Sequence, residues 1–158
     1  GEAVAHPKVV VATQTRVLEA VADEQGLLWP SVPTIAVLPE PEDLLAVLAV
    51  VLAPPITAWA YAEVAGAALA RGEVLFSAPK VLRIPLPPRP ACPRGARRLP
   101  QPVTPAGRAR QEEAWRSALE VFGRCMCDAY RVDDDLARWW HARVPNRRPA
   151  GSRTDHQA

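Results

Sequence analysis

Short apolar runs separated by turn-forming residues dominate the N-terminal part of the chain. Val9–Ala12 and Thr34–Leu38 are rich in β-branched residues, a composition that is typical of buried strands. Val17–Ala22 is largely apolar and leads into an acidic turn that ends at Gly26, where glycine permits a positive φ. We expect this turn to form a hairpin, with Leu27–Trp29 as the partner strand.

The pattern then changes to two apolar helices. Leu44–Ala53 follows a segment of acids and prolines and is apolar on every face, which predicts a buried helix. Pro54-Pro55 ends that helix because proline lacks a backbone donor, and its second proline can begin a helix over Ile56–Val64. Val74–Phe76 and Val81–Ile84 are short strand candidates.

The C-terminal half carries a helical pattern after a stretch rich in proline and arginine. Apolar residues recur there at helical spacing: Trp115, Leu119, Phe122, Met126 and Ala129. Asp133 can cap a second helix, so we expect a helical hairpin over residues 109–144. The whole pattern predicts an α+β protein. A small mixed sheet and a buried helix pair would lie within residues 1–90, a linker over 91–108 and a disordered tail over 145–158.

The apolar stretch and the cysteines indicate the compartment. Leu44–Ala62 contains 19 consecutive residues without a formal charge, which is the length of a membrane span. Its internal prolines, and the acids Asp43 and Glu63 at its ends, favour a buried helix pair over that alternative, and we expect no membrane association. The 3 cysteines form an odd set, which disfavours a disulfide framework and predicts a cytoplasmic protein.

Charge is distributed unevenly along the chain. The net charge is +2, but residues 1–78 hold 3 basic and 9 acidic groups, whereas residues 79–158 hold 16 basic and 8 acidic groups. The acid-free stretch Pro79–Arg110 carries many of the basic residues: Lys80, Arg83, Arg89, Arg94, Arg97, Arg98, Arg108 and Arg110. Such a distribution can attract a polyanion to one face of the protein.

Sequence motifs for catalysis are missing. The glycines are too scattered for a phosphate-binding loop, and no serine stands in a nucleophile-elbow pattern. Cys125 and Cys127 would point about 200° apart on a helix, so core thiols are a better interpretation than a zinc site. Asp133–Asp135 suits a solvated helix start better than a cation site. Of Trp139 and Trp140, which could also stack on bases, we expect one in the core and the other in contact with a neighbouring surface. We therefore assign no catalytic and no metal-binding residue.

Several short motifs follow one another in the order found in a known family. Ala12–Thr15 is a polar step after the first strand, and Leu52–Pro55 breaks an apolar helix. Trp59 and Tyr61 place aromatic residues in the next helix, and Leu82–Pro87 has the form L-x-x-I-P-L-P. In this order the motifs resemble the target-recognition domain of adenine-N6 DNA methyltransferases, the TaqI-like enzymes and those of type I and type IIG restriction-modification systems.

The resemblance covers residues 8–88 and implies that the chain binds double-stranded DNA. In that family the recognition domain faces the major groove while a catalytic domain flips the target adenine out of the stack. Our candidates for DNA contact are Gln14, Arg16, Arg71, Lys80 and Arg83. Gln14 suits an adenine edge and Arg71 a guanine, whereas Lys80 and Arg83 suit phosphates.

The chain departs from the family where the chemistry would take place. The methylation motif, asparagine or aspartate followed by P-P-Y or P-P-F, is absent, as is the glycine-rich S-adenosylmethionine site. The resemblance therefore implies no cofactor on this chain. S-adenosylmethionine would lie on a methyltransferase catalytic domain or subunit, either before Gly1 or on a partner chain. The alternative is a protein-interaction or subunit-docking module without DNA binding, which would use the apolar stripe of the C-terminal helix.

Overall fold

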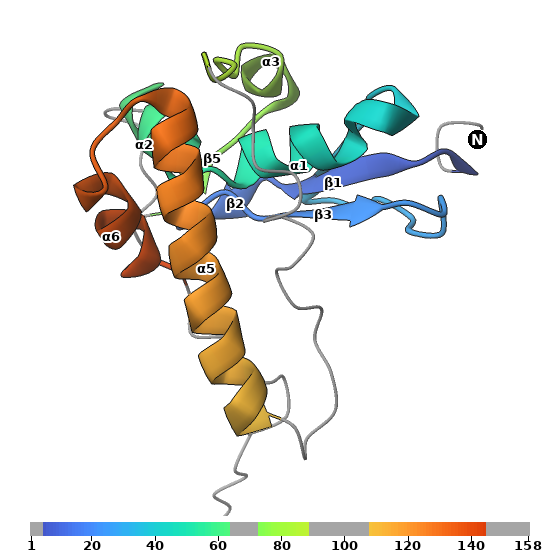
Figure 1. Ribbon diagram of the computed structural model, residues 1–158. Helices are drawn as coiled ribbons and strands as arrows, with labels where there is room; N and C mark the ends of the chain where they lie inside the picture. Colours follow the sequence, from blue (N-terminus) through green and yellow to red (C-terminus); the bar gives the residue numbers. More distant parts are fainter. Residues whose placement is uncertain (1–4, 64–72, 89–107, 145–158) are drawn as a thin grey trace, which may run out of the picture.

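A computed structural model of the chain describes residues 5–63, 73–88 and 108–144 (Figure 1). The fold class is α+β, as predicted: a small sheet carries helices on one face, and a helical hairpin follows. The predicted linker, apart from Arg108, and the predicted tail lie outside the described residues.

The sheet has the strand order β3-β1-β4. Its central strand is β1 (Lys8–Ala12), flanked by β3 (Ala20–Asp23) and β4 (Thr34–Val37). Both outer strands run antiparallel to β1, so they are parallel to each other, and residues 24–33 carry the chain across the sheet. The described strand pairs are all antiparallel, so this is not the mixed sheet that the sequence predicted.

A two-stranded ribbon continues from the end of β1. Its strands are β2 (Gln14–Thr15) and β5 (Val74–Leu75), which pair antiparallel. The carbonyl oxygen of Thr13 accepts a hydrogen bond from the backbone N–H of Phe76 at 2.7 Å. The ring of Phe76 is buried edge-on against Trp59, so the ribbon is attached to the helical layer.

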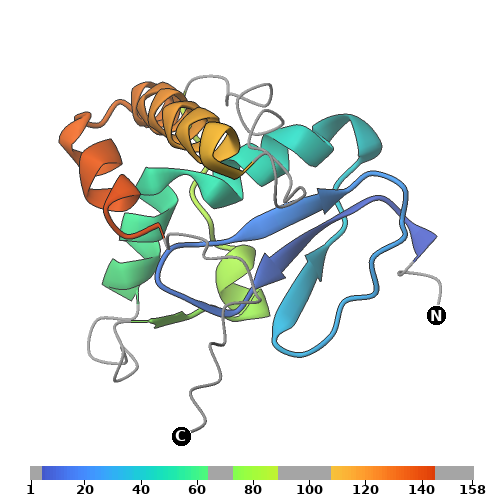
Figure 2. The same ribbon diagram turned by 90° about the horizontal axis from the view of Figure 1, so that it is seen from below.

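Two helices joined at a proline break form the centre of the core. The short helix η2 (Pro41–Asp43) leads into α1 (Leu44–Leu52), and α2 (Pro54–Glu63) follows directly. α1 packs on the sheet face that carries Val9 and Val11, both of which are fully buried (Figure 2). The predicted buried helix pair is confirmed.

The break bends the two helices by 61°. Ala53 has an extended backbone with ψ at 136°, the conformation that a following proline favours, and Pro54 begins the next helix, where a missing N–H has no cost. Within the described ranges, no single helix has the length and apolarity needed to cross a membrane. The bent pair meets that criterion only by length and composition.

The C-terminal elements form the predicted helical hairpin. α5 (Arg108–Tyr130) and α6 (Asp135–His141) pack on each other and on α2. The apolar stripe of α5 is buried in the common core at Leu119, Phe122 and Met126. A Cβ on Gly123 would lie 3.3 Å from the Cβ of Ala137 and 3.6 Å from the Cγ of Pro54. Glycine therefore lets α5 approach both neighbouring helices closely.

A short helix replaces one predicted strand. The sequence favours a strand over Val81–Ile84, but the chain forms α3 (Ala78–Val81) and then a turn. Pro79 lies in the first turn of α3, where its fixed φ suits a helix. The backbone N–H of Val81 bonds to the carbonyl of Ser77 at 3.1 Å, so it is not available for strand pairing.

The predicted hairpin strand Leu27–Trp29 is also wrong. Gly26 has the expected positive φ, +70°, but the chain beyond it does not pair with β3. The backbone N–H groups of Leu27 and Leu28 instead bond to the carboxylate of Asp23, at 2.9 and 2.8 Å. The side chain of Asp23 thus takes the donors that a strand would have used.

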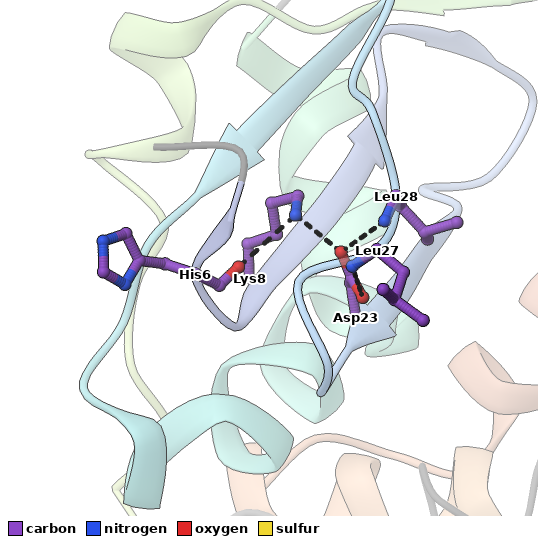
Figure 3. Close-up of polar contacts among 5 residues, drawn as sticks. All are labelled: His6, Lys8, Asp23, Leu27 and Leu28. Atoms are coloured by element: carbon purple, nitrogen blue, oxygen red, sulfur yellow. Dashed lines mark hydrogen bonds and ion pairs between the residues drawn. The ribbon is translucent and has the colours of Figure 1, made fainter. Parts of the chain in front are cut away.

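Asp23 also forms a buried ion pair at the base of this loop (Figure 3). Lys8 is 0% exposed, and its Nζ lies 2.5 Å from Oδ2 of Asp23 and 3.3 Å from the carbonyl oxygen of His6. Side chains alternate along a strand, so Lys8 points away from the face that packs on α1. An isolated ammonium group would be very costly there, and the carboxylate compensates its charge.

The pKa of Asp23 lies well below its ordinary value. Burial is the largest influence and would raise the pKa. The hydrogen bond from Lys8, those from Leu27 and Leu28, and the charge of Lys8 outweigh burial and lower the pKa from 3.8 to about 2. The carboxylate is therefore ionised throughout the neutral range.

Removing the buried ammonium group should destabilise the protein strongly. We expect Lys8→Met to lower the free energy of unfolding by about 3 kcal/mol, because it leaves the carboxylate of Asp23 buried without its counter-charge. Urea unfolding followed by circular dichroism measures this change. Lys80→Met is the matched control, since Lys80 is only partly buried, and it should cost no more than about 0.5 kcal/mol. Equal losses in the two variants would contradict a structural role for the pair.

The ion pair also predicts an acid-sensitive difference in stability. A carboxylate whose pKa is lowered by folding stabilises the protein above its unfolded pKa, and that contribution is lost as the pH falls through the folded pKa. For Asp23 the window runs from about pH 4 down to about 2. The stability difference between the wild type and Lys8→Met should therefore narrow over this window in urea unfolding. A constant difference would contradict the lowered pKa.

Candidate nucleic-acid interface

Four of the five candidate DNA-contact residues lie in the described part of the chain. Gln14 begins β2 and Arg16 follows it, and both are exposed. Lys80 lies in α3, and Arg83 stands in the turn just after that helix. Arg71, the predicted guanine contact, falls outside the described residues.

Gln14 and Lys80 both lie next to strand β5 of the ribbon. Gln14 lies directly opposite Leu75 of β5. The Nζ of Lys80 is 3.5 Å from the carbonyl oxygen of that same Leu75. Two residues far apart in the sequence are therefore held on one two-stranded element, and α3 approaches it from the β5 side.

The C-terminal end of α2 contacts both arginine residues. The hydroxyl group of Tyr61 donates a hydrogen bond to the backbone carbonyl of Arg16 at 2.8 Å. Two residues further along the chain, the carboxylate of Glu63 pairs with Nη1 of Arg83 at 3.2 Å. We call these four candidate residues, with the groups that contact them, the ribbon surface. In Figures 1 and 2 its strands lie beside α2, away from the N-terminus.

Two carboxylates belong to the ribbon surface, and neither was expected from the sequence. Glu73 accepts a hydrogen bond from the Nε2 of Gln14 at 3.0 Å, and Glu63 pairs with Arg83. Gln14 and Glu73 are 59 positions apart, and no local pattern indicates such a contact. The carboxylates orient the two donors, and they also offset positive charge that would attract phosphates.

One tryptophan of the pair lies in the core and the other contacts a neighbouring helix, as predicted. Trp140 is buried and its ring packs against Phe122. Trp139 is half-buried, with its edge against Tyr61 and the guanidinium of Arg143 4.3 Å from the ring centroid. A base could stack on that face of Trp139 only after displacing Arg143, so the pair adds no direct stacking platform.

Neither a metal-binding cluster nor a reactive Cys127 thiol is found in the described residues. Within these ranges, no group of three or more histidine, cysteine or acidic side chains is placed to hold a metal ion. Burial, with a further contribution from the charge of Asp134, raises the pKa of the Cys127 thiol to about 11. A thiol with that pKa stays protonated at neutral pH and is a poor nucleophile.

Comparison with known proteins adds no relative. No protein-family model, no curated protein and no solved structure matches the chain. A function has to be inferred from the chain's own residues, and the ribbon surface is the candidate site that they form.

Replacing Arg83 should leave the stability of the protein almost unchanged. Its side chain is 68% exposed in the pair with Glu63, and ion pairs in water contribute little. We expect Arg83→Gln to change the free energy of unfolding by less than about 0.5 kcal/mol in urea. Arg138→Gln is a matched control, because Arg138 is 74% exposed and pairs with Asp135. A large loss of unfolding free energy in Arg83→Gln, without a similar loss in Arg138→Gln, would show that the pair of Arg83 with Glu63 stabilises the fold.

Proposed function

We propose that the chain is the DNA-binding target-recognition module of an adenine-specific DNA methyltransferase, and that the ribbon surface contacts the duplex. The observation that carries this proposal is the gathering of Gln14, Arg16, Lys80 and Arg83 around one short ribbon and one helix end. Their chemistry supports it, because amide and guanidinium groups suit base edges and cationic groups suit phosphates.

The charge distribution along the chain gives a second line of support. α3 begins the acid-free stretch that runs from Pro79 to Arg110. Its first basic residues, Lys80 and Arg83, are members of the ribbon surface. Further arginines of this stretch would add to the attraction that a duplex experiences, because each neutralised phosphate releases a counterion.

The two carboxylates of the ribbon surface would compete with DNA for the side chains that bind it. In the free protein, Glu63 and Glu73 engage Arg83 and Gln14. A phosphate or base edge has to replace these contacts, so binding exchanges one set of polar contacts for another. Such an exchange lowers the affinity for any duplex, and it favours a sequence whose base edges suit the released side chains.

The alternative, a docking module that uses the apolar stripe of α5, has less support. Leu119, Phe122 and Met126 already pack inside the chain's own core, so they are not available to a partner. The side chain of Trp115 lies outside the described residues.

DNA binding can be tested by fluorescence anisotropy with labelled duplexes of mixed sequence. We expect wild-type protein to bind at about 50 mM salt and to lose affinity steeply towards about 200 mM. Arg83→Gln should weaken binding about fivefold and reduce the salt slope by about 1, because one phosphate contact is lost. Glu63→Gln should strengthen binding, because it removes a negative charge beside Arg83.

Arg138→Gln is the matched control for this experiment. It removes an equally exposed arginine from an ion pair in α6, and it should leave the affinity within about twofold of the wild type. Two results would overturn the proposal. One is the absence of duplex binding at low salt. The other is an equal loss of affinity in Arg83→Gln and Arg138→Gln, which would indicate a general charge effect.

A further inference from the structure

The loop after β3 presents large apolar side chains to solvent. Leu27 is 76% exposed and Trp29 is 75% exposed. Exposed apolar side chains of this size are frequent in binding loops, where tryptophan often provides the central contact. Leu28, beside them, is also exposed, so the apolar side chains form a continuous run.

This loop is held in place at its base. Asp23 accepts hydrogen bonds from the backbone N–H groups of Leu27 and Leu28, and the buried Lys8 fixes Asp23 (Figure 3). A Cβ on Gly26 would lie 2.5 Å from the carbonyl oxygen of Ala5, so the turn also fits closely against the residues that lead into β1. A loop ordered in the free protein loses little conformational entropy when it binds.

The same end of the sheet carries a further exposed apolar residue and several acids. In the pairing register Val37 lies opposite Val9, which places the next residue, Leu38, level with Lys8 but across β1 from Asp23. Leu38 is half-exposed. The exposed acids of this end are Glu24, Glu40, Glu42 and Asp43. We call residues 24–29 and 38–43 together the acidic loop end; Figure 1 shows the two segments on either side of the start of β1.

We propose that the acidic loop end is a docking surface for a protein segment that combines apolar side chains with lysine or arginine. Trp29 and Leu27 would insert between the apolar side chains of the partner. The carboxylates at the same end of the sheet would attract and pair with its basic groups. This surface does not depend on DNA binding by the ribbon surface, because the two lie at opposite ends of β1.

Charge complementarity selects this class of partner over a nucleic acid or an anionic membrane. The acidic loop end contains 4 acidic residues and no basic one. A polyanion would be repelled by these carboxylates, whereas a basic segment would be attracted to them before it makes contact. Apolar contact at Trp29 would then supply most of the affinity, and the acids would set the specificity and the association rate.

A random peptide library displayed on phage tests the proposal with the intact chain as target. We expect the selected peptides to contain apolar residues together with lysine or arginine. Synthetic copies, measured by fluorescence anisotropy, should bind Trp29→Ala at least tenfold more weakly than wild type. They should bind the double variant Glu40→Gln/Glu42→Gln several-fold more weakly, with a smaller dependence on salt.

Val121→Ala is the control, because Val121 is an exposed apolar residue on α5, outside the acidic loop end; its binding should match the wild type. Circular dichroism checks that each variant is folded. The proposal is overturned if no selected peptide distinguishes wild type from Trp29→Ala, or if the selected peptides lack basic residues. The proposal is also overturned if Trp29→Ala abolishes duplex binding, because the loop would then bind DNA. Loss of a dimer in Trp29→Ala, measured by light scattering, would overturn it as well, because the occupant would then be a second copy of the chain.

Discussion

Burying the ammonium group of Lys8 has a large hydration penalty, and the fold compensates it through one carboxylate. Asp23 pairs with Lys8 and at the same time accepts two backbone N–H groups from the loop that follows. The single side chain therefore ties β3 to β1 and directs the chain away from a hairpin. From this loop, residues 24–33 cross to β4 on the far side of β1.

The bend between α1 and α2 connects the sheet to the C-terminal helices. α1 covers the buried face of the sheet, while α2 turns away and receives α5 and α6. The end of α2 then supplies the side chains that hold the ribbon surface, Tyr61 on Arg16 and Glu63 on Arg83. Two of the four candidate DNA-contact residues, Arg16 and Arg83, are thus contacted by the end of a helix that packs on α1, α5 and α6.

The two ends of β1 have opposite chemistry. Beyond Ala12, the ribbon surface collects amide and cationic groups that suit a polyanion. At the Lys8 end, the two segments of the acidic loop end carry exposed apolar side chains and carboxylates. On the two proposals made above, one small sheet would separate a nucleic-acid contact from a protein contact, since attraction at one end and repulsion at the other would orient a duplex.

Local patterns in the sequence were sufficient for the elements whose stability is local. The strand Val9–Ala12, the helix break at Pro54 and the helical hairpin are encoded by side-chain periodicity and by proline geometry, which act over a few residues. The partner of each strand, the loop over Leu27–Trp29 and the contacts of Glu63 and Glu73 were decided by the tertiary structure. Each depends on groups distant in the chain, and a carboxylate such as Asp23 can redirect a backbone only once the fold has buried it beside its lysine.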